Sequence, residues 1–182
     1  MLEAGAVLPL DPTYDERAFV DMLTRLCETT IGIFGNAPYK DYTFLFAGAG
    51  GGLEHLNSTT IGFNIPRMER DPTTHEGVAA HEFFHTWNVK RIRPVELGPF
   101  DYTRPVRTVN LWVSEGVTDY YTHLILVRSG LDSAPDFVRK IESSIARHRN
   151  NPARLRVSPE HSSWTVWDDP ATNGSLQISY YL

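Results

Sequence analysis

The pentapeptide HEFFH at positions 81–85 constrains the fold of this chain more than any other part of its sequence. On an α-helix, a spacing of four residues brings the second side chain to within ~40° of the first, so His81 and His85 would project from one face. Two imidazoles on one face can bind the same metal ion. The fold must therefore place a helix here and bring a further ligand to it from elsewhere in the chain.

The residues around this motif carry the signals of a helix. Thr73 and Glu76 have the spacing of a capping box, which predicts a helix that begins there and runs to about Val89. Basic residues at the end of a helix are more often solvated than bound to a peptide carboxylate. We therefore expect a solvent-exposed position for the basic residues that follow, which are Lys90, Arg91 and Arg93.

Glu82 has the residue type and the position of a general base. It is rotated by about 100° from His81, so it would flank a bound metal ion rather than ligate it. Zinc lowers the pKa of a bound water to about 7, and a nearby carboxylate can take the proton as the hydroxide attacks a carbonyl. Together with the types of ligand, the motif predicts Zn²⁺ as the cofactor and hydrolysis as the reaction.

Two histidines leave a catalytic zinc ion one protein ligand short. Glu115, in the segment LWVSEGVTDYY of the next predicted helix, is the best candidate for the third ligand. Asp119 follows four residues later on the same helical face and could accept the second ring N–H of a ligand histidine. An isolated HExxH can be a surface helix with two solvated histidines, but the agreement of several independent signals favours the metal site here.

The rest of the sequence predicts one α+β domain, with a small mixed sheet in its N-terminal part and mainly helices afterwards. Apolar periodicity, β-branched and aromatic density, and capping residues indicate helices at 14–34, 110–130 and 133–151 and strands at 42–47 and 59–65. Residues 175–182 have the pattern of a helix that starts but does not finish. We therefore interpret residues 1–182 as a catalytic domain cut from a longer protein.

Composition excludes several other classes of function. The net charge of -5 and the absence of a long basic run argue against binding of nucleic acid or an anionic membrane. No apolar run approaches the ~20 residues of a membrane span. Cys27 is the single cysteine, so the chain has no internal disulfide and no thiolate metal site, and its apolar setting predicts a buried thiol. The cellular compartment stays undecided.

Four blocks of this sequence resemble the glycyl aminopeptidase family: GGLEH, HEFFHTWNVKRIRP, LWVSEGVTDYY and SYYL. The resemblance implies a thermolysin-like (gluzincin) catalytic domain with one zinc ion. It also implies that His81, His85 and Glu115 bind this ion and that Glu82 is the base. Members of the family add a β-sandwich before this domain and a PDZ-type module after it, so we expect flanking domains in the full protein.

The same resemblance implies roles for residues outside the metal site. Related alanyl-type aminopeptidases carry a G-x-M-E-N strand whose glutamate binds the free α-amine of the peptide substrate, and its counterpart here is Glu54, which could hold an ammonium group by charge-assisted hydrogen bonds. We read Gly51 and Gly52 as part of a turn that lets the substrate approach. A tyrosine of those relatives hydrogen-bonds the oxyanion, and the register places it at Tyr181, with Tyr180 as the alternative.

The favoured function is therefore removal of N-terminal residues from peptides, with glycine and alanine preferred because the family resemblance implies it. Two alternatives remain open. An endopeptidase of thermolysin type would use the same metal site without needing a free amine. A binding or scaffolding domain would retain zinc without catalysis.

Overall fold

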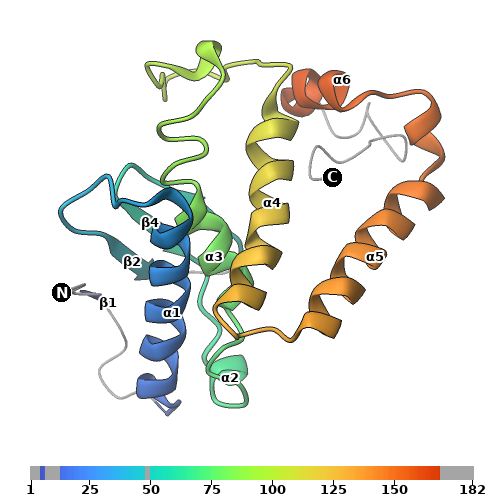
Figure 1. Cartoon of the computed structure of the whole chain (residues 1–182). Helices are drawn as coiled ribbons and strands as arrows, with labels where there is room; N and C mark the ends of the chain where they lie inside the picture. Colours follow the sequence, from blue (N-terminus) through green and yellow to red (C-terminus); the bar gives the residue numbers. More distant parts are fainter. Residues whose placement is uncertain (1–4, 7–12, 48–49, 169–182) are drawn as a thin grey trace.

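The computed structural model describes residues 5–6, 13–47 and 50–168 of the chain (Figure 1). These residues form a four-stranded mixed sheet and six α-helices, which agrees with the predicted α+β class. The strands are β1 (Gly5–Ala6), β2 (Thr43–Phe46), β3 (Gly52–Glu54) and β4 (Ser58–Ile61). The helices are α1 (Glu16–Phe34), α2 (Ile65–Met68), α3 (Glu76–Phe84), α4 (Leu111–Arg128), α5 (Ala134–Asn150) and α6 (Pro159–Trp164). Short 3₁₀ turns lie at Val95–Leu97, Pro152–Leu155 and Thr165–Trp167.

The sheet has the strand order β1-β2-β4-β3, with β1, β2 and β4 parallel and β3 antiparallel at one edge. Alternate side chains of the central strands enter the core, as the two-residue period of a strand requires: Phe44 and Phe46 from β2, and Thr59 and Ile61 from β4. The strands are shorter than predicted at both positions. The edge strand β3, which carries Glu54 at its end, packs against α3.

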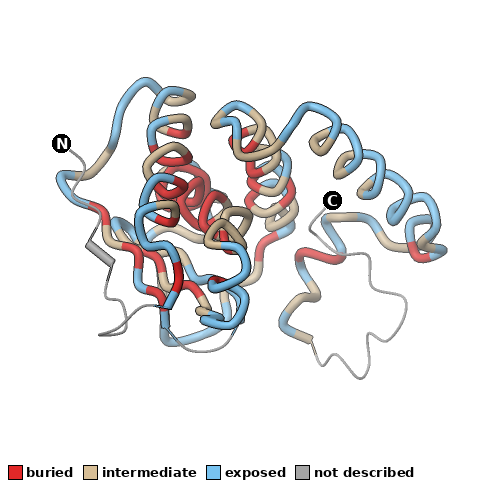
Figure 2. The backbone as a smooth tube through the Cα atoms, turned by 90° about the horizontal axis from the view of Figure 1, so that it is seen from below, coloured by how far each residue is buried: buried red, intermediate tan, exposed pale blue. Residues whose placement is uncertain are grey.

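The core lies between this sheet and the helices α1 and α3, and α4 packs against α3 (Figure 1). Aromatic rings join the layers: Phe19 of α1 meets Phe46 of β2 at 4.9 Å between centroids, and Phe83 of α3 meets Tyr42 at 4.8 Å. Such edge-to-face contacts stabilise beyond the area that they bury. Figure 2 shows the buried residues gathered in this part of the molecule, whereas no residue of α5 is buried.

The first helix follows its sequence signals closely. Asp15 caps α1 by accepting a hydrogen bond from the Ala18 amide, and Gly35 ends the helix with a φ of 78°. The Cys27 thiol is buried as predicted, and this burial raises its pKa far above the ordinary value. No helix in the described part of the chain combines the length and the hydropathy that crossing a membrane demands.

The predicted start and end of α3 are both wrong. The Thr73 amide and hydroxyl donate to Asp71 at 2.9 and 2.7 Å, so Thr73 closes a local turn instead of capping the helix. His75 occupies the N-cap position without a side-chain cap bond. The helix ends at Phe84 rather than near Val89, because the His85 carbonyl accepts from two successive amides and the last turn widens.

The two following helices end close to their predicted limits. Asn110 precedes α4 but makes no side-chain cap bond, so the helix begins where expected without the expected cap. The capping box of Ser133 and Asp136 at the start of α5 is confirmed, and Asn151 follows its last residue. The incomplete helix predicted at 175–182 lies outside the described residues.

Candidate metal centre

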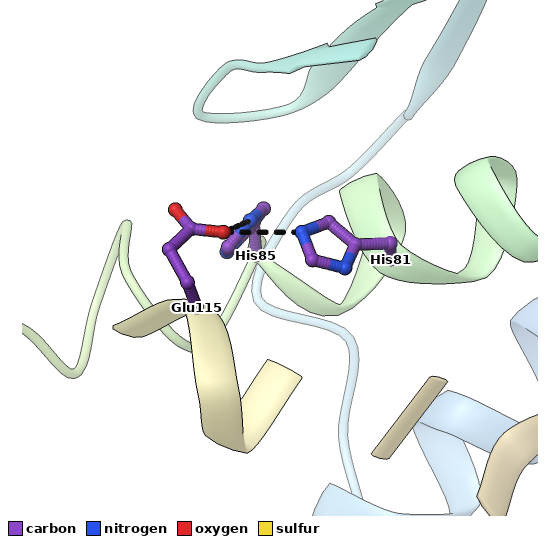
Figure 3. Close-up of side chains that lie close together, drawn as sticks. All are labelled: His81, His85 and Glu115. Carbon is purple, nitrogen blue, oxygen red and sulfur yellow. Dashed lines mark hydrogen bonds and ion pairs between the residues drawn. The ribbon is translucent and has the colours of Figure 1, made fainter. Parts of the chain in front are cut away.

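The predicted ligands come together between α3 and α4. His81 lies in the last turn of α3 and His85 directly follows that helix, while Glu115 lies in the first part of α4. Glu115 Oε2 is 3.2 Å from His81 Nε2 and 3.4 Å from His85 Nε2, and Figure 3 shows the carboxylate directed at both rings. Packing of α3 against α4 therefore juxtaposes side chains that are distant in sequence.

The arrangement of these three side chains fits a zinc ion. Their ligand atoms all lie within 4.8 Å of one another. Ligand atoms about 2.0–2.1 Å from a tetrahedral zinc ion would lie about 3.3–3.4 Å apart, which is close to both measured separations. Two imidazole nitrogens and one carboxylate are also a donor set that catalytic zinc sites use, with the fourth position left for water or substrate.

A backbone hydrogen bond fixes the tautomer of His85. Its Nδ1 lies 2.6 Å from the Asn88 carbonyl, and since a carbonyl can only accept, Nδ1 carries the proton. Nε2, which faces Glu115, is then the ring nitrogen that can bind a metal ion once it is deprotonated. The Asn88 amide group donates to the Ser114 carbonyl at 3.0 Å and to the Thr118 hydroxyl at 3.1 Å, so Asn88 also ties the end of α3 to α4.

Sequence reasoning missed Asn88. It lies outside the HExxH motif. Its role depends on its own carbonyl, which accepts from His85, and on the position of α4, to which its side chain donates. A polar residue three positions after a ligand histidine, in an apolar setting, is the only sequence signal that could have pointed to it.

The charges of the site suit ligand and base roles. Burial would raise the pKa of Glu115, but hydrogen bonds and charges of His81 and His85 outweigh it and hold the pKa at about 2. Glu115 is therefore ionised, as a metal ligand must be. Burial raises the pKa of Glu82 to about 7, although His85 and His81 act in the opposite direction. A carboxyl group with such a pKa can exchange a proton near neutral pH.

Glu82 lies against the edge strand β3. A Cβ atom at Gly52 would stand 2.4 Å from Glu82 Oε1, so the strand can pass this close to the carboxylate only with glycine there. Glu82 is buried, and its Oε2 has no hydrogen-bond partner among the described residues. Gly51, with a φ of 72°, needs the left-handed conformation open to glycine. A direct role of the two glycines in substrate binding stays a prediction.

Glu54 lies near Glu82 and forms an ion pair with a lysine. One carboxylate oxygen of Glu54 lies within 4.8 Å of Glu82 and His85 ligand atoms. Lys90 Nζ is 3.1 Å from Glu54 Oε1, and the lysine side chain is only 4% exposed. The expectation that Lys90 is a solvated residue at the helix exit is therefore wrong, because the widened turn after α3 directs it inward to a counter-charge.

Asp119 and the two C-terminal tyrosines are the remaining predicted site residues. Asp119 lies one helical turn after Glu115 and borders a hollow between α4 and α5 together with His123 and His148. Its contact with a ligand histidine stays a prediction. Tyr181 and the alternative Tyr180 lie outside the described residues.

The chain is similar to a known peptidase family and to a solved aminopeptidase structure. The family model described as M61 glycyl aminopeptidase matches residues 74–182. A search of curated proteins finds no match. The crystal structure of an aminopeptidase N family protein from Idiomarina loihiensis superimposes with a TM-score of 0.87 and 27% sequence identity. The match covers 99% of this chain and 33% of that chain, so this chain spans about a third of its length.

Proposed function

Because the chain belongs to the M61 glycyl aminopeptidase family, we propose that it is the catalytic core of a zinc-dependent aminopeptidase with a thermolysin-like (gluzincin) fold. The substrate is a peptide with a free N-terminus, and the reaction is hydrolysis of its first peptide bond. A preference for N-terminal glycine or alanine is proposed from the family alone. The observation that carries the proposal is the convergence of His81, His85 and Glu115.

His81, His85 and Glu115 would hold the ion, and the structure supports the states that His85 and Glu115 need for this. The Asn88 carbonyl keeps the His85 Nε2 lone pair available, and the low pKa of Glu115 keeps its carboxylate charged. When bound, zinc supplies a Lewis acid that polarises the substrate carbonyl and lowers the pKa of a water.

Glu82 is proposed as the general base and then as the general acid. Its carboxylate would take a proton from the attacking water and deliver it to the leaving nitrogen as the bond between that nitrogen and the carbonyl carbon breaks. The shortened peptide would then depart as the amine, and the N-terminal amino acid would be released with the water oxygen in its carboxylate. Three observations support this role: Glu82 is buried, its Oε2 has no hydrogen-bond partner in the described part of the chain, and the close approach of Gly52 restricts how the side chain can turn.

Glu54 is proposed to bind the substrate ammonium, and Tyr181 to hydrogen-bond the oxyanion. The first role is supported by the position of Glu54 on the edge strand within 4.8 Å of Glu82. A charged hydrogen bond at this position would select peptides with a free N-terminus. The role of Tyr181 rests on the family pattern.

One observation favours a second candidate, a thermolysin-type endopeptidase. The charge of Glu54 is already compensated by Lys90 in the structure, so this carboxylate attracts a further cation less strongly than an unpaired one. An endopeptidase would extend the substrate past Glu54 and have no use for an amine anchor.

A pair of peptides separates the two candidates. The purified protein in its full natural length is incubated with a peptide that begins with glycine and with its N-acetylated twin, with and without a chelator, and products are identified by mass spectrometry. Release of glycine from the free peptide alone, stopped by chelator, is expected. Internal cleavage of both twins would establish the endopeptidase, and cleavage of neither would contradict both candidates.

A further inference from the structure

Lys90 is an unusual lysine because it is almost completely buried beside the candidate site. It follows the ligand His85 by five positions, its side chain is 4% exposed, and its ammonium lies 3.1 Å from Glu54 Oε1. Lysine is rarely buried to this extent unless it is paired, because an ammonium loses its hydration there. The ion pair with Glu54 is the compensation that the structure provides.

Two further contacts hold Lys90 in place. Its Nζ lies 4.4 Å from the centroid of the Phe100 ring, in the position of a cation–π interaction. Arg93 lies over the same ring at 4.9 Å and donates to the Lys90 carbonyl. The backbone and the ammonium of Lys90 are therefore both fixed, so the lysine is the stationary partner of the pair.

Glu54 is the partner that needs to be held. It ends the three-residue edge strand β3, and its side chain is 22% exposed. The carboxylate of Glu82 lies within 4.8 Å, and two carboxylates so close repel each other. Without a counter-charge, Glu54 would turn towards solvent.

We propose that Lys90 is a positioning residue that holds the Glu54 carboxylate in the orientation in which it binds the substrate ammonium. Lys90 does not touch the substrate, and it acts through Glu54 alone. The Lys90 ammonium thus stays bound to the Glu54 carboxylate, while the substrate ammonium binds to the same carboxylate and leaves it in each catalytic cycle. This inference rests on the proposed aminopeptidase function, because it concerns the residue that recognises the free amine.

The test measures binding rather than turnover. The probe is a glycine-starting ketomethylene peptide, in which CH₂ replaces the first amide NH so that it cannot be hydrolysed, together with its N-acetylated twin. Isothermal titration of the zinc-loaded protein gives the ratio of the two Kd values. In Lys90→Met we expect the preference for the free amine to fall at least tenfold with the bound zinc unchanged. Lys90→Arg should restore most of the preference, and the exposed-site control Lys40→Met should leave it intact.

A second background guards against misfolding of the Lys90 variants. In Glu54→Gln the amine preference should already be lost, and adding Lys90→Met should change it less than twofold, because a residue that acts through Glu54 has no effect once that charge is gone. A Lys90→Met protein that keeps the wild-type preference, or an equal effect of Lys90→Met in both backgrounds, would overturn the positioning role.

The outcome for the unaltered protein separates this inference from the proposed function. If the unaltered protein binds both twins equally, the amine anchor itself is wrong, and with it the aminopeptidase proposal and the role of Lys90. If it prefers the free amine and only the Lys90 results fail, the proposed function stands and this inference does not.

Discussion

Helices α3 and α5 are stabilised in different ways. α3 has nine residues and no side-chain cap bond, but Ala79, Ala80, Phe83 and Phe84 are buried in the core. α5 has 17 residues, a capping box, a proline in its first turn and basic residues in its last turn, yet it buries no residue. Packing therefore fixes α3, and local sequence signals fix α5.

The difference explains where the candidate site lies. A helix held from several sides keeps its side chains in fixed positions, as the roles proposed for His81 as ligand and Glu82 as base require. A helix that is held by its own caps can form without having fixed neighbours. Substitutions on α3 should consequently affect activity and folding, while comparable substitutions on α5 should affect neither strongly.

The largest expected effect is on activity, at Glu82. Glu82→Gln removes the proposed base but keeps the volume, so turnover should fall roughly 100- to 10,000-fold. Bound zinc, measured by atomic absorption, should be unchanged because the ligands are intact. Glu142→Gln on the exposed face of α5 is the matched control and should retain full turnover. Equal losses in the two variants would remove the contrast between the helices.

The next largest effect concerns the packing of α3. Phe83→Ala deletes a completely buried ring that touches Tyr42 and Phe44, and should lower the free energy of unfolding by about 3–5 kcal/mol. Urea titration followed by circular dichroism measures the change. A loss below about 1 kcal/mol would show that α3 is not held by its core contacts.

A smaller effect is expected where the sheet presses on α3. Gly52→Ala would place a Cβ against the Glu82 carboxylate and should cost about 1–3 kcal/mol of stability. It should also lower turnover at least tenfold, because Glu82 must shift. Gly32→Ala in α1, where a Cβ meets nothing within 4 Å, is the control and should leave turnover unchanged. Full activity of Gly52→Ala would mean that strand β3 moves to accommodate the new methyl group and that the Glu82 carboxylate keeps its position.

The cap of α5 offers a weaker test. Ser133→Ala removes the side-chain oxygen that accepts from the Asp136 amide, and should lower stability by about 1 kcal/mol without changing turnover. Thermal unfolding of the two proteins under the same conditions gives the difference. A loss of activity that exceeds the loss of folded protein would show that α5 supports the site, and would contradict the contrast between α3 and α5.

The smallest effect is expected on the apolar side of α5. Ile145 is 47% exposed, so Ile145→Ser should change the unfolding free energy by about 0.5 kcal/mol or less. Chemical denaturation again measures it. A change above about 2 kcal/mol would show that this residue is buried in solution and that α5 has a packing partner.

The sequence predicted features that depend on neighbours along the chain. The capping box of α5 and the apolar periodicity of α1 involve residues three or four positions apart, so their physics can be read locally. Helical spacing also explains why His81 and His85 share a face. The position of Glu115 opposite them was predicted from ligand chemistry, and the packing of α3 on α4 supplies it.

The features that were missed depend on partners distant in sequence. Thr73 hydrogen-bonds Asp71, two residues before it, instead of capping α3. Lys90 is buried because Glu54 of the edge strand meets it, and Asn88 bonds across to α4. Residue type alone cannot distinguish a solvated cation from one that is buried against a carboxylate supplied by the fold.

The split origin of the three ligands has a thermodynamic consequence. Because the donors lie on or directly after α3 and on α4, and these helices are joined by the 26 mostly irregular residues 85–110, an ion bound there would act as a cross-link between α3 and α4. Binding to the folded form alone raises stability by mass action, by about 2.7 kcal/mol when free metal is at 100 times its Kd. The folded population would then depend on the concentration of free metal around the protein, so scarcity of the metal would reduce the amount of folded protein as well as its activity.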